Sequence, residues 1–78
     1  MATLRLFGPA RVAAHESSFQ LAGRTVGDVL AAAEARFGPD LAAVVATSSI
    51  WVNGAAASLA DEVGDADEVS VIPPVSGG

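Results

Sequence analysis

The sequence of 78 residues contains no cysteine and no lysine. The absence of cysteine excludes disulfides, thiolate metal sites and cysteine nucleophiles. The absence of lysine excludes polymers in which the C-terminus of one copy of the protein is joined to a lysine side chain of the next. The basic residues are four arginines against nine acids, which gives a net charge of −5. This balance disfavours nucleic-acid binding, because contacts to phosphates require a basic surface.

Long apolar runs are also missing. No segment approaches the ~18–20 uninterrupted apolar residues of a membrane span. The first six residues, MATLRL, lack the basic region and apolar stretch of a signal peptide. We therefore expect a cytoplasmic protein that does not bind membranes. The length suits one small domain. Its apolar residues are mostly small, with 17 Ala and 10 Val against 3 Phe and 1 Trp.

Alternating apolar residues predict four main strands, over residues 4–7, 17–21, 49–52 and 68–72. In the first strand, Leu4 and Leu6 would face the core, and Arg5 and Phe7 would face the other side. Asn53-Gly54 is a strong signal for a tight hairpin turn, followed by a short return strand over residues 55–58.

Thr25 and Asp28 form a capping pattern that predicts the start of the main helix. Gly38-Pro39 would end this helix. Between these two signals, apolar residues recur at helical spacing and form one stripe (Val26, Val29, Leu30, Ala33 and Phe37). Residues 40–46 predict a short second helix. The expected order is β-β-α-β-β-β, which is an α+β fold of the β-grasp type. One main helix would pack across a mixed sheet of about five strands formed by residues 1–73.

The side chains that alternate with the core positions would form an open sheet face. Phe7, Trp51 and Ile72 lie on it together with Arg5 and Ser70, so we expect a docking surface, or partial cover by loops or tail. Five acids within residues 61–68 have two interpretations. They form either a solvated turn or a surface near the tail that steers the protein toward a basic partner.

The last six residues are PPVSGG. Two prolines cannot continue a sheet ladder, and two glycines can pass through a narrow channel. We expect residues 74–78 to form a flexible tail that presents the carboxyl group of Gly78. With a pKa near ~3.5 this carboxylate is unreactive at neutral pH, so any chemistry on it needs activation from outside, typically as an acyl adenylate.

Residues 67–78, DEVSVIPPVSGG, resemble the D-E-V-x-x-x-P-P-V-[ST]-G-G ending of the MoaD/ThiS family of sulfur carriers. Residues 7–11, FGPAR, resemble the family's F-[AG]-x-x-R segment, residues 25–30 its helix start, and residues 52–54 its hairpin. The ending is most similar to that of MoaD members, the small subunits of molybdopterin synthase. The chain departs from the family pattern at Val12 and Ala66, where members usually carry an acid and a glycine.

The resemblance implies a carrier without catalysis or bound cofactor of its own. A MoeB-like, E1-like adenylyltransferase would use ATP to activate Gly78, and a sulfurtransferase would supply sulfur for a thiocarboxylate. The tail would then enter the MoaE-like large subunit of molybdopterin synthase and donate sulfur to a pterin precursor. The residues expected to contact partners are those of the tail and of the open face (Pro74, Val75, Ser76 and Gly77; Phe7, Trp51 and Ile72). The resemblance gives Arg11 a structural or partner-binding role.

Three alternatives stay open. The carrier could serve thiamine, cysteine or secondary-metabolite synthesis instead. The chain could also be a ubiquitin-like modifier that is joined through Gly78 to lysines of other proteins. A free-standing enzyme has little support, because His15-Glu16 is the only neighbouring His-carboxylate pair and no third ligand or nucleophile accompanies it.

Overall fold

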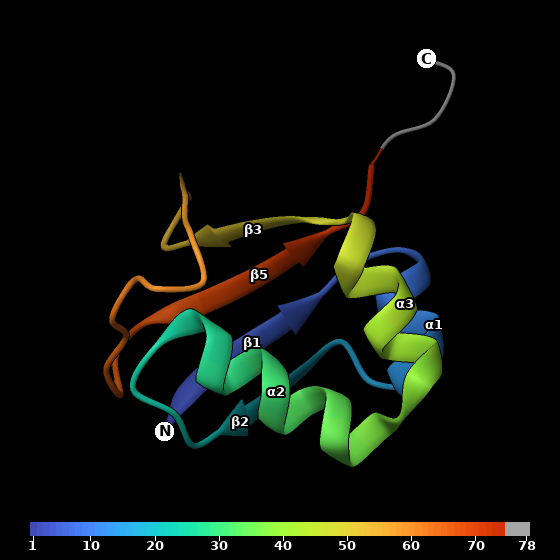
Figure 1. Cartoon of the computed structure of the whole chain (residues 1–78), viewed down its shortest axis with the longest axis horizontal. Coiled ribbons are helices and arrows are strands. Elements are labelled where there is room, and N and C mark those ends of the chain that lie inside the picture. Colours follow the sequence, from blue (N-terminus) through green and yellow to red (C-terminus); the bar gives the residue numbers. More distant parts are fainter. Residues whose placement is uncertain (75–78) are drawn as a thin grey trace.

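Five strands form a mixed sheet in the computed structural model, which describes residues 1–74 (Figure 1). The spatial order is β2-β1-β5-β3-β4, in which β1 and β5 run parallel and the other pairs antiparallel. The α+β, β-grasp class predicted from the sequence is confirmed. The elements are β1 (Ala2–Leu6), α1 (Pro9–Ala14), β2 (Ser18–Leu21), α2 (Val26–Phe37), α3 (Pro39–Thr47), β3 (Ser49–Val52), β4 (Ala55–Ala56) and β5 (Glu68–Ile72).

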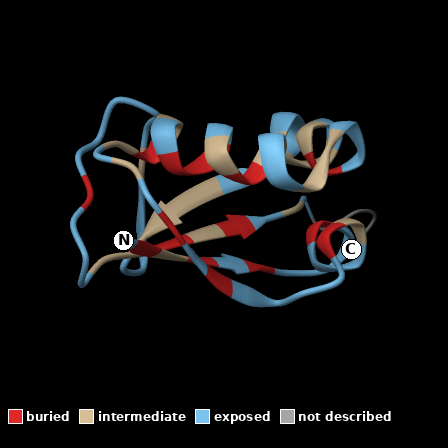
Figure 2. Cartoon of the chain, turned by 90° about the horizontal axis from the view of Figure 1, so that it is seen from below, coloured by how far each residue is buried: buried red, intermediate tan, exposed pale blue. Residues whose placement is uncertain are grey.

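The main helix, α2, begins and packs as the sequence predicts. The Thr25 hydroxyl accepts a hydrogen bond from the backbone N–H of Asp28 at 3.1 Å, and the Asp28 carboxylate accepts one from Arg24 N–H at 3.2 Å. These bonds satisfy N–H groups that have no partner inside the helix. Figure 2 shows buried residues between the helices and the sheet. The apolar stripe of α2 is buried there (Val26, Val29, Leu30 and Ala33).

A helix that the sequence analysis missed follows β1. The predicted order has no helix between the first two strands, but Pro9–Ala14 forms α1. Gly8 precedes it with φ +54°. Pro9, at the first helical position, has no backbone N–H that would need a hydrogen-bond partner. Ala10 and Ala14 are buried, and α1 packs against α3. Tertiary packing therefore stabilises a helix of only six residues, too short to be stable alone.

The second predicted helix is confirmed and is slightly longer than expected. Gly38 adopts φ +90°, closes α2 and leads directly into α3, which begins at Pro39. A side chain would be strained at this φ. Leu41 on α3 is buried in the core. Among residues 1–74, no helix is long and apolar enough to cross a membrane.

Side-chain hydrogen bonds join the β3–β4 turn to the start of β5. Asn53 and Gly54 both have positive φ, as the hairpin signal predicts, and the return strand is only Ala55–Ala56. The Asn53 amide donates to the Asp67 carboxylate and accepts from Glu68 N–H, both at 2.9 Å. Asp67 also accepts from Gly64 N–H at 2.8 Å. These bonds fix the chain where it enters β5.

Candidate partner-binding face

The register of the sheet defines one row of outward-facing residues that crosses all five strands. Arg5 on β1 lies opposite Ser18 on β2 and Ser70 on β5, and Ser70 lies opposite Trp51 on β3. Trp51 in turn lies opposite Ala56 on β4. Neighbouring positions such as Leu4, Val69 and Val71 are buried on the other side. The two faces therefore separate as the alternation predicts.

Apolar side chains are exposed at the end of this face where β1 and β5 finish. Phe7 is 43% exposed and Ile72 is 38% exposed. The register pairs Leu6 with Val71, so the next residues, Phe7 and Ile72, emerge at the same end of the two strands. Gly8 lies against Pro73, where an added Cβ would be 3.8 Å from Cγ. We call Phe7, Ile72 and Pro73 the apolar end of β5.

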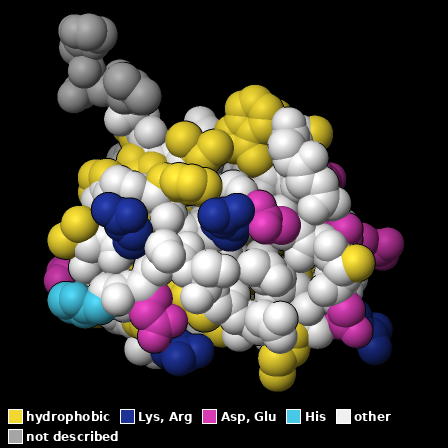
Figure 3. Space-filling model, turned by 180° about the vertical axis from the view of Figure 1, so that it is seen from behind, with side chains coloured by type: hydrophobic (Ala, Val, Ile, Leu, Met, Phe, Trp, Pro, Cys, Tyr) yellow, Lys and Arg dark blue, Asp and Glu magenta, His cyan; other side chains and the backbone are white. Residues whose placement is uncertain are grey.

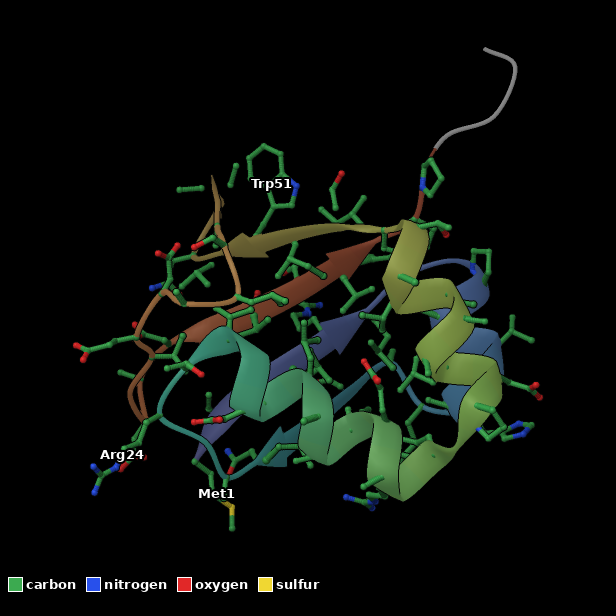
Figure 4. The ribbon with its side chains drawn as sticks, viewed as in Figure 1. Met1, Arg24 and Trp51 are labelled. Carbon is green, nitrogen blue, oxygen red and sulfur yellow. The ribbon has the colours of Figure 1, made fainter. Side chains whose placement is uncertain are left out.

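Trp51 and Arg11 flank the apolar end. Trp51 is half-buried on β3, and Figure 4 shows its side chain projecting from this strand in the direction away from α2. Arg11 is exposed on α1, which begins two residues after Phe7. Figure 3 views the open face and shows hydrophobic side chains gathered along its upper part, with basic side chains beside them.

Arg5 contributes more to this face than the sequence analysis assigned to it. Its guanidinium carbon lies 5.8 Å from the centre of the Phe7 ring. One of its nitrogens lies 3.7 Å from a carboxylate oxygen of Glu68. The alternation of the first strand places Arg5 outward, but its contact with Glu68 depends on the parallel pairing of β1 with β5.

The acidic cluster lies at the end of β5 remote from Pro74, the last described residue, whereas one interpretation placed it near the tail. Glu68 begins β5 and Ile72 ends it, so the acids and the chain leading to Pro74 lie at opposite ends of the strand (Figure 1). Hydrogen bonds from Gly64 N–H and the Asn53 amide lower the pKa of Asp67, and the N-terminal ammonium, in contact with Asp65, lowers the pKa of Asp65. The cluster is therefore an internally bonded turn.

The alternative site at His15-Glu16 gains no support from the fold. His15 is the left-handed residue that ends α1, with φ +62°, and both side chains are exposed. Within residues 1–74, no three His, Cys, Asp or Glu side chains lie close enough together to hold a metal ion. The predicted reactive residue Gly78 and the tail residues Val75, Ser76 and Gly77 lie outside the described residues, whereas Pro74 is exposed.

Several solved structures are similar to this chain in sequence and in fold. No curated protein sequence matches the chain. Small archaeal modifier protein 1 from Haloferax volcanii is 30% identical, with a TM-score of 0.82 over 99% of this chain and 98% of that one. A chain of the BexX/CysO complex of Amycolatopsis orientalis is 25% identical, with a TM-score of 0.85 and complete coverage of both chains.

A putative molybdopterin converting factor subunit 1 from Pyrococcus furiosus is also similar. It is 27% identical, with a TM-score of 0.79, and the match covers 95% of this chain and 97% of that one. The sequence model of the ThiS family matches residues 4–78, which includes all but the first two residues of the sheet, and the terminal Gly-Gly. The chain belongs to the ThiS family of small ubiquitin-fold sulfur carriers.

Proposed function

We propose that this chain carries sulfur as a thiocarboxylate on Gly78. The observation that carries the proposal is that the ThiS family match extends through the last residue, which is the second glycine of the terminal pair. The composition is compatible with this role, because a carrier that is activated by a partner needs no nucleophilic or metal-binding side chain of its own.

The chemistry requires two displacement steps. The Gly78 carboxylate attacks the α-phosphorus of ATP on an adenylyltransferase, which forms the acyl adenylate and releases pyrophosphate. A hydrosulfide ion then attacks the acyl carbon, and AMP leaves with the electrons of the acyl–oxygen bond. If a persulfide is the donor, a thiol must afterwards reduce the resulting acyl disulfide. When the thiocarboxylate sulfur attacks an acceptor, the acyl group is left as a thioester. Water then cleaves the acyl–sulfur bond, which leaves the sulfur on the acceptor and returns the carboxylate, so the carrier can be loaded again.

The open face is the surface that we assign to partner binding. The exposed fractions of Phe7 and Ile72 support this assignment, as does their position where β5 leads toward the tail. Trp51 and Arg11 extend the surface on either side. A partner that buries Phe7 and Ile72 gains hydrophobic free energy and receives the C-terminal segment at the same time.

For the pathway, we propose the role of small subunit in a molybdopterin synthase, with a MoeB-like adenylyltransferase and a MoaE-like large subunit as partners. The PPVSGG ending and the similarity to the Pyrococcus furiosus protein support this choice. ATP and the pterin precursor would be bound by the partners. A sulfurtransferase would supply the sulfur, and this chain would contribute no catalytic residue to the complex.

A second candidate is a protein modifier joined through Gly78 to lysines of other proteins. The similarity to a small archaeal modifier protein favours it. The similarity to a chain of the BexX/CysO complex favours a carrier that serves another biosynthetic pathway. Both candidates keep the reactive carboxyl at Gly78. The other carrier differs from the first proposal only in the sulfur acceptor, whereas the modifier transfers the Gly78 acyl group itself to a lysine amine as the activating group leaves.

The test is an intact-mass measurement after incubation with ATP, a MoeB-like adenylyltransferase and a sulfur donor. We expect a mass shift equal to exchange of one oxygen for sulfur, located on Gly78. A variant with one alanine appended after Gly78 is the control, since it keeps every residue but displaces the carboxyl group. Absence of the shift, with an enzyme that loads another carrier, would refute the proposal.

The acceptor is tested with the loaded chain. Incubation with a MoaE-like subunit and the cyclic pterin precursor should form a dithiolene product and return the chain to its original mass. Isopeptide-linked adducts on other proteins in cell extract, without transfer to the pterin, would instead support the modifier function.

A further inference from the structure

Arg5 is the cation on the outward positions of the three central strands. Those positions are Thr3 and Arg5 on β1, Ser49 and Trp51 on β3, and Glu68, Ser70 and Ile72 on β5. They hold one positive and one negative side chain, on a protein whose net charge is −5. These positions therefore carry no net charge, unlike the molecule as a whole, and their one cation lies beside the exposed ring of Phe7.

The internal contacts of Arg5 hold it weakly. Its side chain is 50% exposed, and the ion pair with Glu68, itself 43% exposed, is long at 3.7 Å. Exposed pairs of this kind contribute at most about 1 kcal/mol to stability. The contact with the Phe7 ring at 5.8 Å is of similar strength at an exposed site. Fold stability alone gives little reason for an arginine at this position.

The same contacts orient the guanidinium group. One guanidinium nitrogen lies near the carboxylate of Glu68, and the guanidinium carbon lies over the ring of Phe7, the residue that follows β1. A guanidinium carries five N–H donors in a planar fork, so donors remain for a further carboxylate. The group is thus placed beside the apolar end of β5 with unused capacity to bind an anion.

We propose that Arg5 is a specificity-determining residue of the open face, which binds a carboxylate on the activating adenylyltransferase next to the apolar pocket that receives Phe7 and Ile72. This inference rests on the proposed function. The partner is a protein whose surface combines an apolar depression with an acidic side chain. Charge complementarity of this kind selects the orientation of docking and raises the association rate.

The test compares two arginines in binding to a MoeB-like adenylyltransferase that loads the unmodified chain. Arg5→Glu reverses the proposed contact, and Arg24→Glu makes the same charge change where Figure 4 places Arg24, at the end of the molecule where β1 begins. By calorimetric titration, we expect Kd to rise about tenfold or more for Arg5→Glu and less than about threefold for Arg24→Glu. Equal effects of the two substitutions would overturn the inference.

A neutral variant separates charge from folding. Arg5→Met keeps an unbranched side chain over Phe7 and removes the cation, so it should weaken binding and reduce the salt dependence of Kd while the Tm stays close to that of the unmodified chain. An unchanged salt dependence would count against a charge contact. At saturating adenylyltransferase, Arg5→Glu should still form the thiocarboxylate, because the substitution affects KM and not the reacting carboxyl.

The two proposals can fail separately. If the unmodified chain forms no thiocarboxylate, the proposed function fails. If the unmodified chain is loaded, and Arg5→Glu is loaded with the same KM, only the role of Arg5 fails.

Discussion

The two ends of strand β5 are built in opposite ways. Where the strand begins, polar groups bind one another, as Asn53 bridges Asp67 and Glu68 through hydrogen bonds of 2.9 Å. Where it ends, Phe7 and Ile72 expose 43% and 38% of their surface. At the first end, these polar groups find their hydrogen-bond partners within the chain. The second leaves apolar surface in water at the point where the chain leads to its terminal Gly-Gly.

This difference assigns roles within one motif. The D-E-V part of the family ending stabilises the entry into β5, because Asp67 accepts bonds from Gly64 N–H and from Asn53. The residues from Ile72 onward are those that the proposed function assigns to partners. Under this proposal, a motif that is continuous in sequence divides into a structural half and a binding half. Substitutions at the two ends should therefore change different measurable quantities.

Deletion of Gly77 and Gly78 should have the largest effect. We expect complete loss of sulfur loading in the intact-mass assay, because the deletion removes Gly78, whose carboxyl group is the proposed site of adenylation. The Tm should stay the same, since the buried core of the described residues ends at Val71. A large fall in Tm on truncation would mean that the terminal residues stabilise the fold, and the division of β5 into two halves would be wrong.

Adjacent positions near the end of β5 give the next largest contrast. Ile72→Asp should raise Kd for the adenylyltransferase about 10- to 100-fold and lower the unfolding free energy by only about 1 kcal/mol. Val71→Ala, on the buried face of the same strand, should do the reverse: a loss of about 2 kcal/mol with Kd nearly unchanged. Denaturant titration and calorimetry measure the two quantities. Parallel losses at Ile72 would show that its side chain belongs to the core.

At the other end of the strand, Asn53→Ala should affect stability alone. The substitution removes two hydrogen bonds and places alanine at φ +51°, where a left-handed backbone is costly. We expect a loss of about 1–2 kcal/mol in unfolding free energy with partner binding and loading unchanged. Gly54→Ala is a matched control with φ +85° but none of these side-chain bonds. If Asn53→Ala weakened binding as well, the polar end would also belong to the interface.

Local signals in the sequence were enough to predict most of this fold. The bounds of the strands at residues 49–52 and 68–72 agree with the structure, because apolar alternation and the flanking Asn53-Gly54 and Pro73-Pro74 breakers mark them locally. The α1 helix was missed because six residues give too little periodicity, and its stability comes from packing on α3. Pro9 after Gly8 was the available signal.

The candidate face was predicted only in part. Alternation placed Phe7 and Ile72 outward, which the structure confirms. The contact of Arg5 with Glu68 could not be predicted, because it requires the parallel register of β1 and β5, whose residues are far apart in sequence. The direction of β5 shows that the acids lie at the end of this strand remote from Pro74, which the sequence alone did not determine.

The smallest expected effect concerns pH and the polar end. The pKa of Asp67 is lowered by the hydrogen bonds from Gly64 and Asn53, so its charged form is favoured in the folded state. The unfolded chain then binds more protons than the folded chain between the two pKa values. The stability contributed by Asp67 is therefore fully present above the unfolded value of about 3.9 and is lost as the pH falls through the lowered folded value.

Asp67→Asn should remove this contribution. We expect a small fall in Tm at pH 7 and a smaller difference from the unmodified chain as the pH falls below 4, measured by thermal unfolding from pH 7 down to pH 2. Because Asp67 lies at the polar end of β5, loading of Gly78 at pH 7 should not change. A variant that lost the same stability at every pH would show that Asp67 acts through packing alone. The charged hydrogen bonds that distinguish the polar end from the apolar end would then contribute nothing to folding.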